Sequence, residues 1–528
     1  MRTKNTMEKI EEKNIIRVGI GIQSYPKVEI NFSPEIPQLR KTEDKTQVNI
    51  RYTLIAPFAF AHIYWNNKIS ELVYEIEEPV LTKKEEQYRE ELISAMENMI
   101  NFDTIVEKEI NVLLDYIDKM FRILAVELGL DIPYESFKKI YYYLVRNFVG
   151  FNEAEPLLRD YFVEDIECNG AETPIYIVHR IYRNMKTNVV FNDMDKLASF
   201  VEKLAQRVGK YISYANPILD GSLPDGSRVN ATYTKDITSR GPTFTIRKFT
   251  KEPWTPPQLI SFNTLSPEML AYLWLLIENE MNILIIGGTS SGKTTLLNAM
   301  AFFIPPESRV VSIEDTRELN LPRENWLPSV ARTATGIGGL GEIDLFALLR
   351  SSFRQNPDYV IVGEVRGKEA FVLFQGMASG HSSISTMHAD SVDTVVKRLE
   401  TPPIELSPSL VNVLDSVCVM THAVVKKQET RKLKEIVEII NVTPEGIALT
   451  NTPFTWNPID DSFYFKRNSK IFEKISRMTG QRMEEIELEF RRRSKLLYMM
   501  YQKKIFGFEK VQEIINEYYK KPEKVLRE

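Results

Sequence analysis

The sequence predicts an α/β protein whose second half is a mostly parallel sheet covered by helices on both faces. From about residue 265 onward, short apolar runs alternate with helical segments: NILII at 282–286, RVVSI at 309–313 and YVIVG at 359–363. Such continuously apolar strands are typical of a parallel sheet that is buried on both faces. The first half mixes strand-like runs, prolines and helical stretches, which predicts an α+β domain and a helical N-terminal subdomain.

The composition is that of a folded protein of more than one domain. The chain has 528 residues, of which 43% are hydrophobic and 26% charged, and its formal net charge is −5. These values exclude disorder as the dominant state, and the negative charge gives no overall attraction toward nucleic acid. Only two cysteines are present, Cys168 and Cys418, so a disulfide framework or a cysteine metal site is not expected.

No segment has the length and hydropathy of a membrane span. The N-terminal residues are polar, and the longest apolar stretch, 54–65, is interrupted by Pro57 and His62. Spanning a bilayer takes about 20 apolar residues, and a secretory signal needs an apolar stretch of its own. We therefore expect a cytoplasmic chain that is peripheral at the inner face of the cell membrane, held there through a partner.

Changes in composition along the chain predict five segments. Residues 1–150 form an accessory part with a helical subdomain, and residues 151–250 form an α+β domain. The proline-rich stretch 251–264 is expected to be a linker. Residues 265–420 carry the parallel sheet, and residues 421–528 form a β-rich and then helical C-terminal extension.

The clearest motif is a glycine-rich phosphate-binding loop. The apolar run 282–286 leads into Gly287-Gly-Thr-Ser-Ser-Gly-Lys-Thr294 and then into an apolar helix. This is the G-x-x-x-x-G-K-T pattern in its strand–loop–helix setting, in which backbone N–H groups and the helix N-terminus bind phosphate oxygens. We expect Lys293 to reach the β- and γ-phosphates of ATP and the Thr294 hydroxyl to ligate Mg²⁺. The residues expected to contact the nucleotide are Gly287, Gly288, Thr289, Ser290, Ser291, Gly292, Lys293, Thr294 and Thr295.

Carboxylates follow two further predicted strands. RVVSI ends in Glu314-Asp315, which we expect at the end of a strand neighbouring the phosphate loop, with one acid acting on the attacking water and the other holding Mg²⁺. The run PDYVIVG is followed by Glu364, whose role would lie in the metal–water network. Gly363 occupies the place where most P-loop enzymes carry a metal-binding aspartate. Glu314 and Asp315 are therefore the predicted suppliers of the missing carboxylate.

Two histidines flank one short apolar segment, GHSSISTMHAD. His381 and His388 are two of only five histidines in the chain. Zinc ligation is disfavoured because no cysteine or third histidine lies nearby in the sequence. A neutral imidazole is instead suited to hydrogen bonding with the γ-phosphate.

Together these motifs resemble the type II/type IV secretion ATPase superfamily. That superfamily is marked by a Walker A loop, an acidic box, a Walker B strand with glycine before its glutamate, and a histidine box. Here they read GGTSSGKT, VSIEDTRE, PDYVIVGEVRG and GHSSISTMHAD, in that order. The resemblance covers about residues 160–420. The segments IEDTREL and LPDGSRVNATY are most similar to the archaeal branch of this superfamily, and within it to the archaellum motor ATPase.

The resemblance implies a homo-hexameric ring in which a mobile N-terminal domain is joined to a RecA-like C-terminal domain. It assigns water activation to Glu314, support of the metal–water network to Glu364, and γ-phosphate sensing to His381 and His388. It also implies an arginine from the N-terminal domain that completes the site. The candidates are Arg228, Arg240 and Arg247, with Arg350, Arg354 and Arg366 as further candidates. The alternative, that some of them only pair with surface acids, stays open.

The resemblance also implies a function and partners. We expect an ATP-driven motor for assembly or rotation of an archaeal surface filament, working with a polytopic membrane platform protein and accessory regulatory proteins. The ATPase of an archaeal pilus or of a type II-like secretion machine is the alternative. A nucleic-acid translocase is opposed by the negative net charge, so no nucleic-acid partner is expected. A small-molecule kinase lacks a recognisable acceptor pocket.

Overall fold

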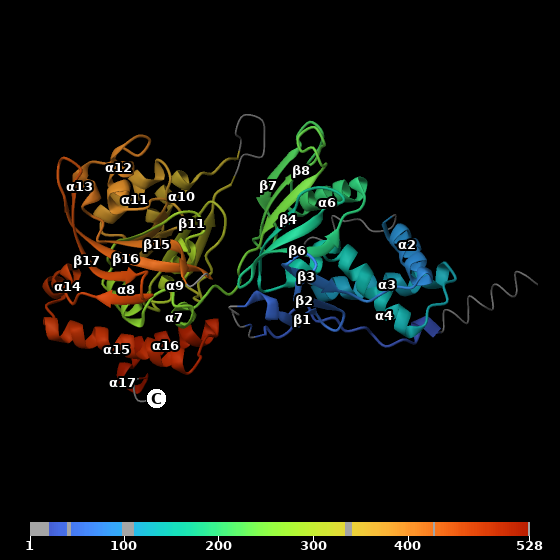
Figure 1. Cartoon of the computed structure of the whole chain (residues 1–528). Helices are drawn as coiled ribbons and strands as arrows, with labels where there is room; N and C mark the ends of the chain where they lie inside the picture. Colours follow the sequence, from blue (N-terminus) through green and yellow to red (C-terminus); the bar gives the residue numbers. More distant parts are fainter. Residues whose placement is uncertain are drawn as a thin grey trace, which may run out of the picture. The chain divides into compact units, whose positions relative to one another are not determined.

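The chain consists of two compact units, Met1–Phe249 and Thr250–Glu528 (Figure 1). The computed structural model describes residues 21–37, 39, 44–97, 110–332, 341–425 and 428–525. Within these residues, no helix combines the length and the hydropathy that crossing a membrane requires.

The first unit is built on a nine-stranded sheet of order β1-β2-β3-β6-β5-β4-β9-β8-β7. Neighbouring strands are antiparallel except β3 and β6, which pair in parallel through Val73 with Lys186 and Tyr74 with Thr187. The strands are β1 (Asn49–Ile55), β2 (Ala59–Asn66), β3 (Glu71–Glu77), β4 (Val163–Cys168), β5 (Pro174–His179), β6 (Arg183–Val190), β7 (Ile218–Ser222), β8 (Arg228–Thr232) and β9 (Thr243–Arg247). The sheet thus runs across residue 150, where the composition predicts a domain boundary, because strand pairing between distant segments leaves no mark on local composition.

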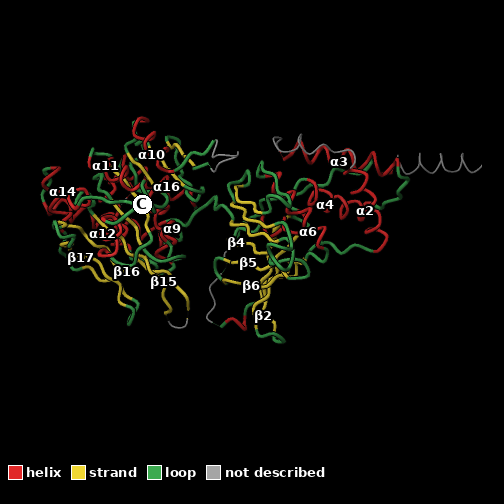
Figure 2. Tube along the Cα trace, turned by 90° about the horizontal axis from the view of Figure 1, so that it is seen from above, coloured by secondary structure: helices red, strands yellow, loops and turns green. Residues whose placement is uncertain are grey.

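Helices of the first unit form a separate core beside this sheet (Figure 2). These are α2 (Lys83–Glu97), α3 (Ile110–Glu127) and α4 (Tyr134–Phe148). Phe121 of α3 and Phe137 of α4 stack with ring centroids 4.4 Å apart. The short α5 (Glu155–Arg159) and the amphipathic α6 (Met194–Arg207) pack on the sheet, α6 through Leu197, Phe200 and Val201.

The second unit holds a nine-stranded sheet of order β12-β11-β13-β14-β10-β15-β16-β17-β18. Its strands are β10 (Ile283–Ile286), β11 (Val310–Glu314), β12 (Trp326–Val330), β13 (Tyr359–Val362), β14 (Ser382–Met387), β15 (Ser416–Val425), β16 (Gln428–Val442), β17 (Ala448–Asn457) and β18 (Ser462–Phe465). Strands β10 to β15 pair in parallel, and β16 to β18 add an antiparallel edge. With the phosphate-loop strand β10 between β14 and β15, this is a RecA-like order, and the predicted fold class is confirmed.

Both faces of the parallel sheet are buried. Successive side chains of each strand point to opposite faces, so each strand contributes to both cores. Ile283 and Ile285 of β10 join the core with α8 (Pro267–Glu278) and α9 (Lys293–Ala301). Leu284 and Ile286 join the core on the other face. That face is covered by α10 (Leu345–Ser352), α11 (Glu369–Ala378), α12 (Val392–Glu400) and the short α13 (Pro408–Val411). The apolar runs in the sequence therefore reflect burial on two sides.

The C-terminal helices belong to the same unit as the sheet. Helices α14 (Lys470–Thr479), α15 (Met483–Gln502), α16 (Phe508–Lys520) and α17 (Pro522–Val525) add apolar side chains to the core around α8. The boundary predicted after residue 420 falls inside β15, and the sheet continues through β18. Within the predicted linker 251–264, α7 (Pro256–Ser261) buries Leu259 and Ile260, and the Thr255 hydroxyl donates to the Phe506 carbonyl at 3.2 Å.

Candidate active site

The phosphate loop connects β10 to α9 and requires glycine at positions 287 and 292 for steric and conformational reasons. Gly287 has φ +153°, and a Cβ there would lie 2.5 Å from the carbonyl oxygen of Met420. Gly292 caps α9 with φ +97°, and Ser290 takes φ +56° although it carries a side chain. These conformations turn the backbone sharply at the N-terminus of α9, as an anion-binding loop requires.

Lys293 folds back onto the backbone of its own loop. Its side chain is buried, and Nζ donates to the carbonyl oxygens of Gly287 at 3.1 Å and Gly288 at 3.0 Å. Burial lowers the pKa of the Lys293 ammonium, while the carboxylates of Glu364 and Glu318 oppose that shift. The ammonium is thus directed at the carbonyls of its own loop.

His388 lies between Lys293 and Glu364, although the Glu364 oxygen that faces it makes no hydrogen bond with a described residue. Its Nδ1 lies 3.4 Å from Lys293 Nζ, and its Nε2 lies 3.2 Å from Glu364 Oε1. Arg366 Nη2 donates to the other oxygen of Glu364 at 2.7 Å. Burial raises the pKa of Glu364, but the hydrogen bond and charge of Arg366, with His388 and Lys293, lower it overall, so the carboxylate is ionised. Burial, and then the charge of Lys293, lower the pKa of His388, which favours the neutral imidazole.

Glu314 is a buried carboxyl, of which one oxygen accepts two hydrogen bonds and the other has no hydrogen-bond partner among the described residues. Its Oε1 accepts the backbone N–H groups of Glu318 and Leu319, both at 2.9 Å. Its Oε2 is buried without a hydrogen-bond partner among the described residues. Burial raises the pKa of Glu314 to about 7, against the two backbone hydrogen bonds. A buried carboxyl with such a pKa has the properties of a general base working near neutrality.

The glycine before Glu364 makes room for Glu314. A Cβ on Gly363 would lie 3.1 Å from Cγ of Glu314. The absence of a side chain at Gly363 therefore leaves space for the Glu314 side chain, which comes from β11. That Glu314 compensates for the missing aspartate stays a prediction.

The expectation that Glu314 ends a strand next to the phosphate-loop strand is wrong. Strands β13 and β14 lie between β11 and β10. The turn after Glu314 instead returns to α9, where Asn298 accepts the Asn320 N–H at 3.1 Å and donates to the Glu318 carbonyl at 3.3 Å. This return brings Glu318 close enough to raise the pKa of Lys293, a contribution that the motif did not predict.

The donors present suit a magnesium ion bound mainly through phosphate and water. Thr294 is half-buried in the first turn of α9, and Asp315 is exposed beyond β11. No group of three or more histidine, cysteine or acidic side chains in the described part of the chain is arranged to cage a metal. Mg²⁺ in nucleotide sites takes one or two protein ligands together with phosphate oxygens and water, which these residues allow.

The structure does not bring His381 to this edge of the sheet. Register pairs Ile286 with Met387, so His388 follows β14 at the phosphate-loop edge, whereas His381 precedes the first residue of β14. A strand of six residues is about 20 Å long. His381 packs on Phe353, with ring centroids 4.8 Å apart, and its Nδ1 lies 3.3 Å from the Gly376 carbonyl oxygen. The two histidines therefore lie at opposite ends of β14, and the predicted sensing of the γ-phosphate by His381 stays a prediction.

The three N-terminal arginines lie in the first unit, so their contribution to this site stays a prediction. Arg228 donates twice to Asp220, both at 3.2 Å, and Arg247 donates to Asp165 at 3.0 Å. Arg228 and Arg247 are cross-strand partners in β8 and β9. Arg240 is exposed in the turn before β9. Of the further candidates, Arg350 and Arg354 are in and after α10, and Arg366 is the one that contacts Glu364.

Arg431 is a neighbour of the phosphate loop that the sequence reasoning missed. It lies on β16, and its Nε donates to the Ser290 carbonyl at 2.9 Å. Its Cδ would be 3.3 Å from a Cβ on Gly292. Sequence alone offers no signal for this contact, because a β-hairpin brings Arg431 back from far along the chain.

These features define a P-loop protein: the sheet is RecA-like, the phosphate loop follows its strand β10, and a histidine and a glutamate lie beside the loop lysine. The chain belongs to the family described as type II/IV secretion system protein, whose family model matches residues 150–450. The uncharacterized protein MJ0900 of Methanocaldococcus jannaschii is 35% identical over 516 residues, 96% of this chain and 88% of that protein. The type IV secretion system protein PtlH of Bordetella pertussis is 34% identical over 229 residues, 39% of this chain and 67% of that protein. The X-ray structure of the Legionella pneumophila ATPase DotB matches 69% of this chain and 94% of its own, at 17% identity and a TM-score of 0.39.

Proposed function

We propose that this chain hydrolyses ATP, with Mg²⁺, at the site around Lys293. The observation that carries the proposal is the cluster of Lys293, His388 and Glu364 at the phosphate loop, together with Glu314, whose buried Oε2 has no hydrogen-bond partner among the described residues. An ammonium aimed into a loop of backbone N–H groups is the arrangement that binds a triphosphate. A buried base with a pKa near neutrality suits the activation of water.

Each residue of the site has a defined part in this reaction. Lys293 releases the Gly287 and Gly288 carbonyls and binds the β- and γ-phosphates. Bound Mg²⁺, held by Thr294 and through water by Asp315, would neutralise phosphate charge. Glu314 takes the proton of the attacking water on Oε2, while its Oε1 stays fixed by two backbone N–H groups. His388, whose ring lies between the Lys293 ammonium and the Glu364 carboxylate, would sense the γ-phosphate through Lys293, and Arg366 holds Glu364 in place.

Hydrolysis at this site is proposed to drive a machine at the membrane. Membership of the type II/IV secretion family supports a motor of such a machine, and the motor is proposed to be a homo-hexamer in the cytoplasm at the inner face of the membrane. Its partners would be a polytopic platform protein and accessory regulators. The machine is proposed to be an archaeal surface filament of the archaellum type. The name of PtlH favours the alternative of a secretion or pilus machine.

Phosphate release by the purified chain tests the activity. We expect Mg²⁺-dependent hydrolysis that is abolished in Lys293→Ala and in excess EDTA, because phosphate then loses its cation. Lys495→Ala is the matched control, since Lys495 is exposed on α15. A wild-type chain that releases no phosphate, or a Lys293→Ala variant as active as the control, would refute the site.

Deletion of the gene in the source organism tests the machine. Loss of swimming with surface pili retained would support the archaellum. Loss of pili or of a secreted protein with swimming retained would support the alternative.

A further inference from the structure

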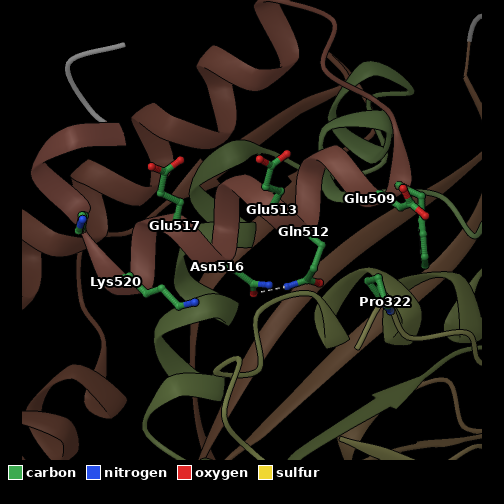
Figure 3. A pocket seen from close by; sticks show the side chains of 9 residues that line it. Pro322, Glu509, Gln512, Glu513, Asn516, Glu517 and Lys520 are labelled. Atoms are coloured by element: carbon green, nitrogen blue, oxygen red, sulfur yellow. Dashed lines mark hydrogen bonds between the residues drawn. The ribbon is translucent and has the colours of Figure 1, made fainter. Parts of the chain in front are cut away.

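The open hollow beside α16 does not distinguish ligands by charge (Figure 3). Three glutamates and two lysines line it, and two of the glutamates are ion-paired with lysines of the same chain. The hollow lies along α16, whereas the proposed active site is built on β10, β11, β13, β14 and the turns that follow them. Within that sheet, a buried threonine, Thr386, makes contacts that none of the assigned roles explains.

Thr386 lies on β14, between β10 and β13. Its cross-strand partner on β10 is Ile285, and its neighbour Ser385 pairs with Val362 at the end of β13. Two residues further along the chain, the same end of β14 leads to His388. Thr386 is 1% exposed. Its hydroxyl therefore needs an acceptor inside the protein, because a buried polar group without one costs free energy.

Thr386 holds both peptide groups that flank Glu364. Its Oγ1 donates to the Gly363 carbonyl oxygen at 2.7 Å, and its own carbonyl oxygen accepts the Val365 N–H at 2.8 Å. These two hydrogen bonds tie the backbone on either side of Glu364 to one residue of β14. The direction of the Glu364 side chain is therefore set from the strand that also leads to His388.

The direction of Glu364 matters because its two carboxylate oxygens face different partners. Oε1 is buried and lies 3.2 Å from His388 Nε2, whereas Oε2 accepts a hydrogen bond from Arg366 Nη2 at 2.7 Å. Rotation of the peptide before Glu364 would swing the carboxylate away from His388. The hydrogen bond from the Thr386 hydroxyl to the Gly363 carbonyl opposes that rotation.

We propose that Thr386 is a positioning residue for ATP hydrolysis, whose hydroxyl fixes the Gly363–Glu364 peptide so that the Glu364 carboxylate faces His388. The inference rests on the proposed function and adds a residue to the same site. Thr386 is assigned no contact with the nucleotide, because it acts through Glu364.

Phosphate release by Thr386→Val and Thr386→Ser tests the positioning. Valine keeps the branched shape and the backbone carbonyl but loses the hydroxyl, so we expect kcat to fall about 10–100-fold while the KM for ATP stays nearly constant. Serine keeps the hydroxyl and should restore most of kcat. Ser385→Ala is the matched control, because it removes a buried hydroxyl from the same strand that has no hydrogen-bond partner among the described residues. If the valine variant does not fold, Thr386→Ala removes the same hydroxyl with a smaller side chain.

Exchange of backbone amide hydrogens, followed by mass spectrometry, tests the Thr386 hydrogen bond without any hydrolysis. In Thr386→Val, the amides of residues 364–367 should exchange about fivefold faster, the effect of one lost hydrogen bond, while those of β13 and β14 stay unchanged. Thr386→Ser and Ser385→Ala should exchange as the wild type does. Unchanged exchange at 364–367 would overturn the inference, and faster exchange along the whole sheet would show that Thr386 only stabilises the fold.

The two measurements separate this inference from the proposed function. A valine variant with the wild-type kcat, a serine variant as slow as the valine variant, or a loss confined to KM would overturn the positioning by Thr386. A wild-type chain that releases no phosphate would refute the proposed function, and the exchange rates would still decide whether Thr386 holds the turn at Glu364.

Discussion

At the scale of single residues, Glu314 is the side chain whose environment is least expected for an acid. Burial raises its pKa to about 7 from an ordinary value of 4.5. Its Oε1 accepts two backbone hydrogen bonds, whereas its Oε2 has no partner among the described residues. Glu364 differs, because its pKa is lowered overall despite burial. Two carboxyl groups with opposite shifts in one site are suited to different tasks, a proton acceptor and a permanent anion.

Replacement of Glu314 by glutamine should abolish hydrolysis and stabilise the fold. Glutamine keeps an acceptor for the two backbone N–H groups but accepts no proton, so we expect kcat to fall by about 10²–10⁴. In the wild type, kcat should rise with pH around 7. Because the folded-state pKa lies above 4.5, stability is fully present below pH 4.5 and is lost as the pH rises through 7. Urea unfolding should show the variant to be more stable by about 3 kcal/mol at pH 8 and equal at pH 4.5. Equal stability at both pH values would contradict the buried carboxyl.

The space beside Glu314 makes Gly363 a second sensitive position. A methyl group there would approach Glu314 Cγ to 3.1 Å, so Gly363→Ala should shift the carboxyl and lower kcat. The KM for ATP should stay nearly constant, because Gly363 is not part of the phosphate loop. Gly367→Ala, where a Cβ meets only the end of the Glu369 side chain, is the control. A normal kcat in Gly363→Ala would show that Glu314 tolerates displacement.

At the scale of elements, the β15–β16 hairpin supports the phosphate loop. Arg431 of β16 donates to the carbonyl of Ser290, a residue held at φ +56°. Non-glycine residues in this region cost free energy and persist only when their surroundings hold them there. The hydrogen bond from Arg431 therefore helps to hold Ser290, and with it the phosphate loop, in this conformation.

Removal of the Arg431 side chain should weaken nucleotide binding more than it slows the reaction. We expect Arg431→Ala to raise the Kd for an ATP analogue about fivefold to tenfold, the effect of a charged hydrogen bond. His422→Ala changes the cross-strand partner of Arg431 and leaves the bond to Ser290 intact, which makes it the control. Calorimetric titration of both variants measures the difference, and equal Kd values would remove Arg431 from the site.

These elements also show what the sequence predicts and what it leaves out. The apolar runs at 282–286, 309–313 and 359–363 correspond to β10, β11 and β13, because burial on two faces is visible in local sequence. The glycines and Lys293 form the expected loop because the whole motif, Gly287 to Thr294, lies within one short stretch of the sequence. The order of strands is set by pairing between distant segments, so the separation of β11 from β10 could not be predicted. The same holds for Arg431, and for the distance between His381 and His388, which depends on β14 running between them.

At the scale of the whole molecule, the division after Phe249 separates two self-contained sheets. The described residues that form or pack against the cores of the second unit all lie from Trp254 onward. A cut after residue 420 would instead break β15 and remove the helices that cover Trp274. We expect residues 250–528 to unfold cooperatively as a fragment, and residues 250–420 to aggregate.

The fragment 250–528 also tests whether the first unit completes the active site. It retains Lys293, Glu314, Glu364 and His388, so it should bind an ATP analogue with nearly the Kd of the full chain. It lacks Arg228, Arg240 and Arg247, the candidate cations for the transferring phosphoryl group. Such an arginine is worth about 10³–10⁵ in rate, so hydrolysis by the fragment should fall by that order. Triple replacement of these arginines by alanine in the full chain should reproduce the loss. A fragment as active as the full chain would mean that the second unit holds the whole catalytic apparatus, and Arg366 would then be the cation at the phosphate.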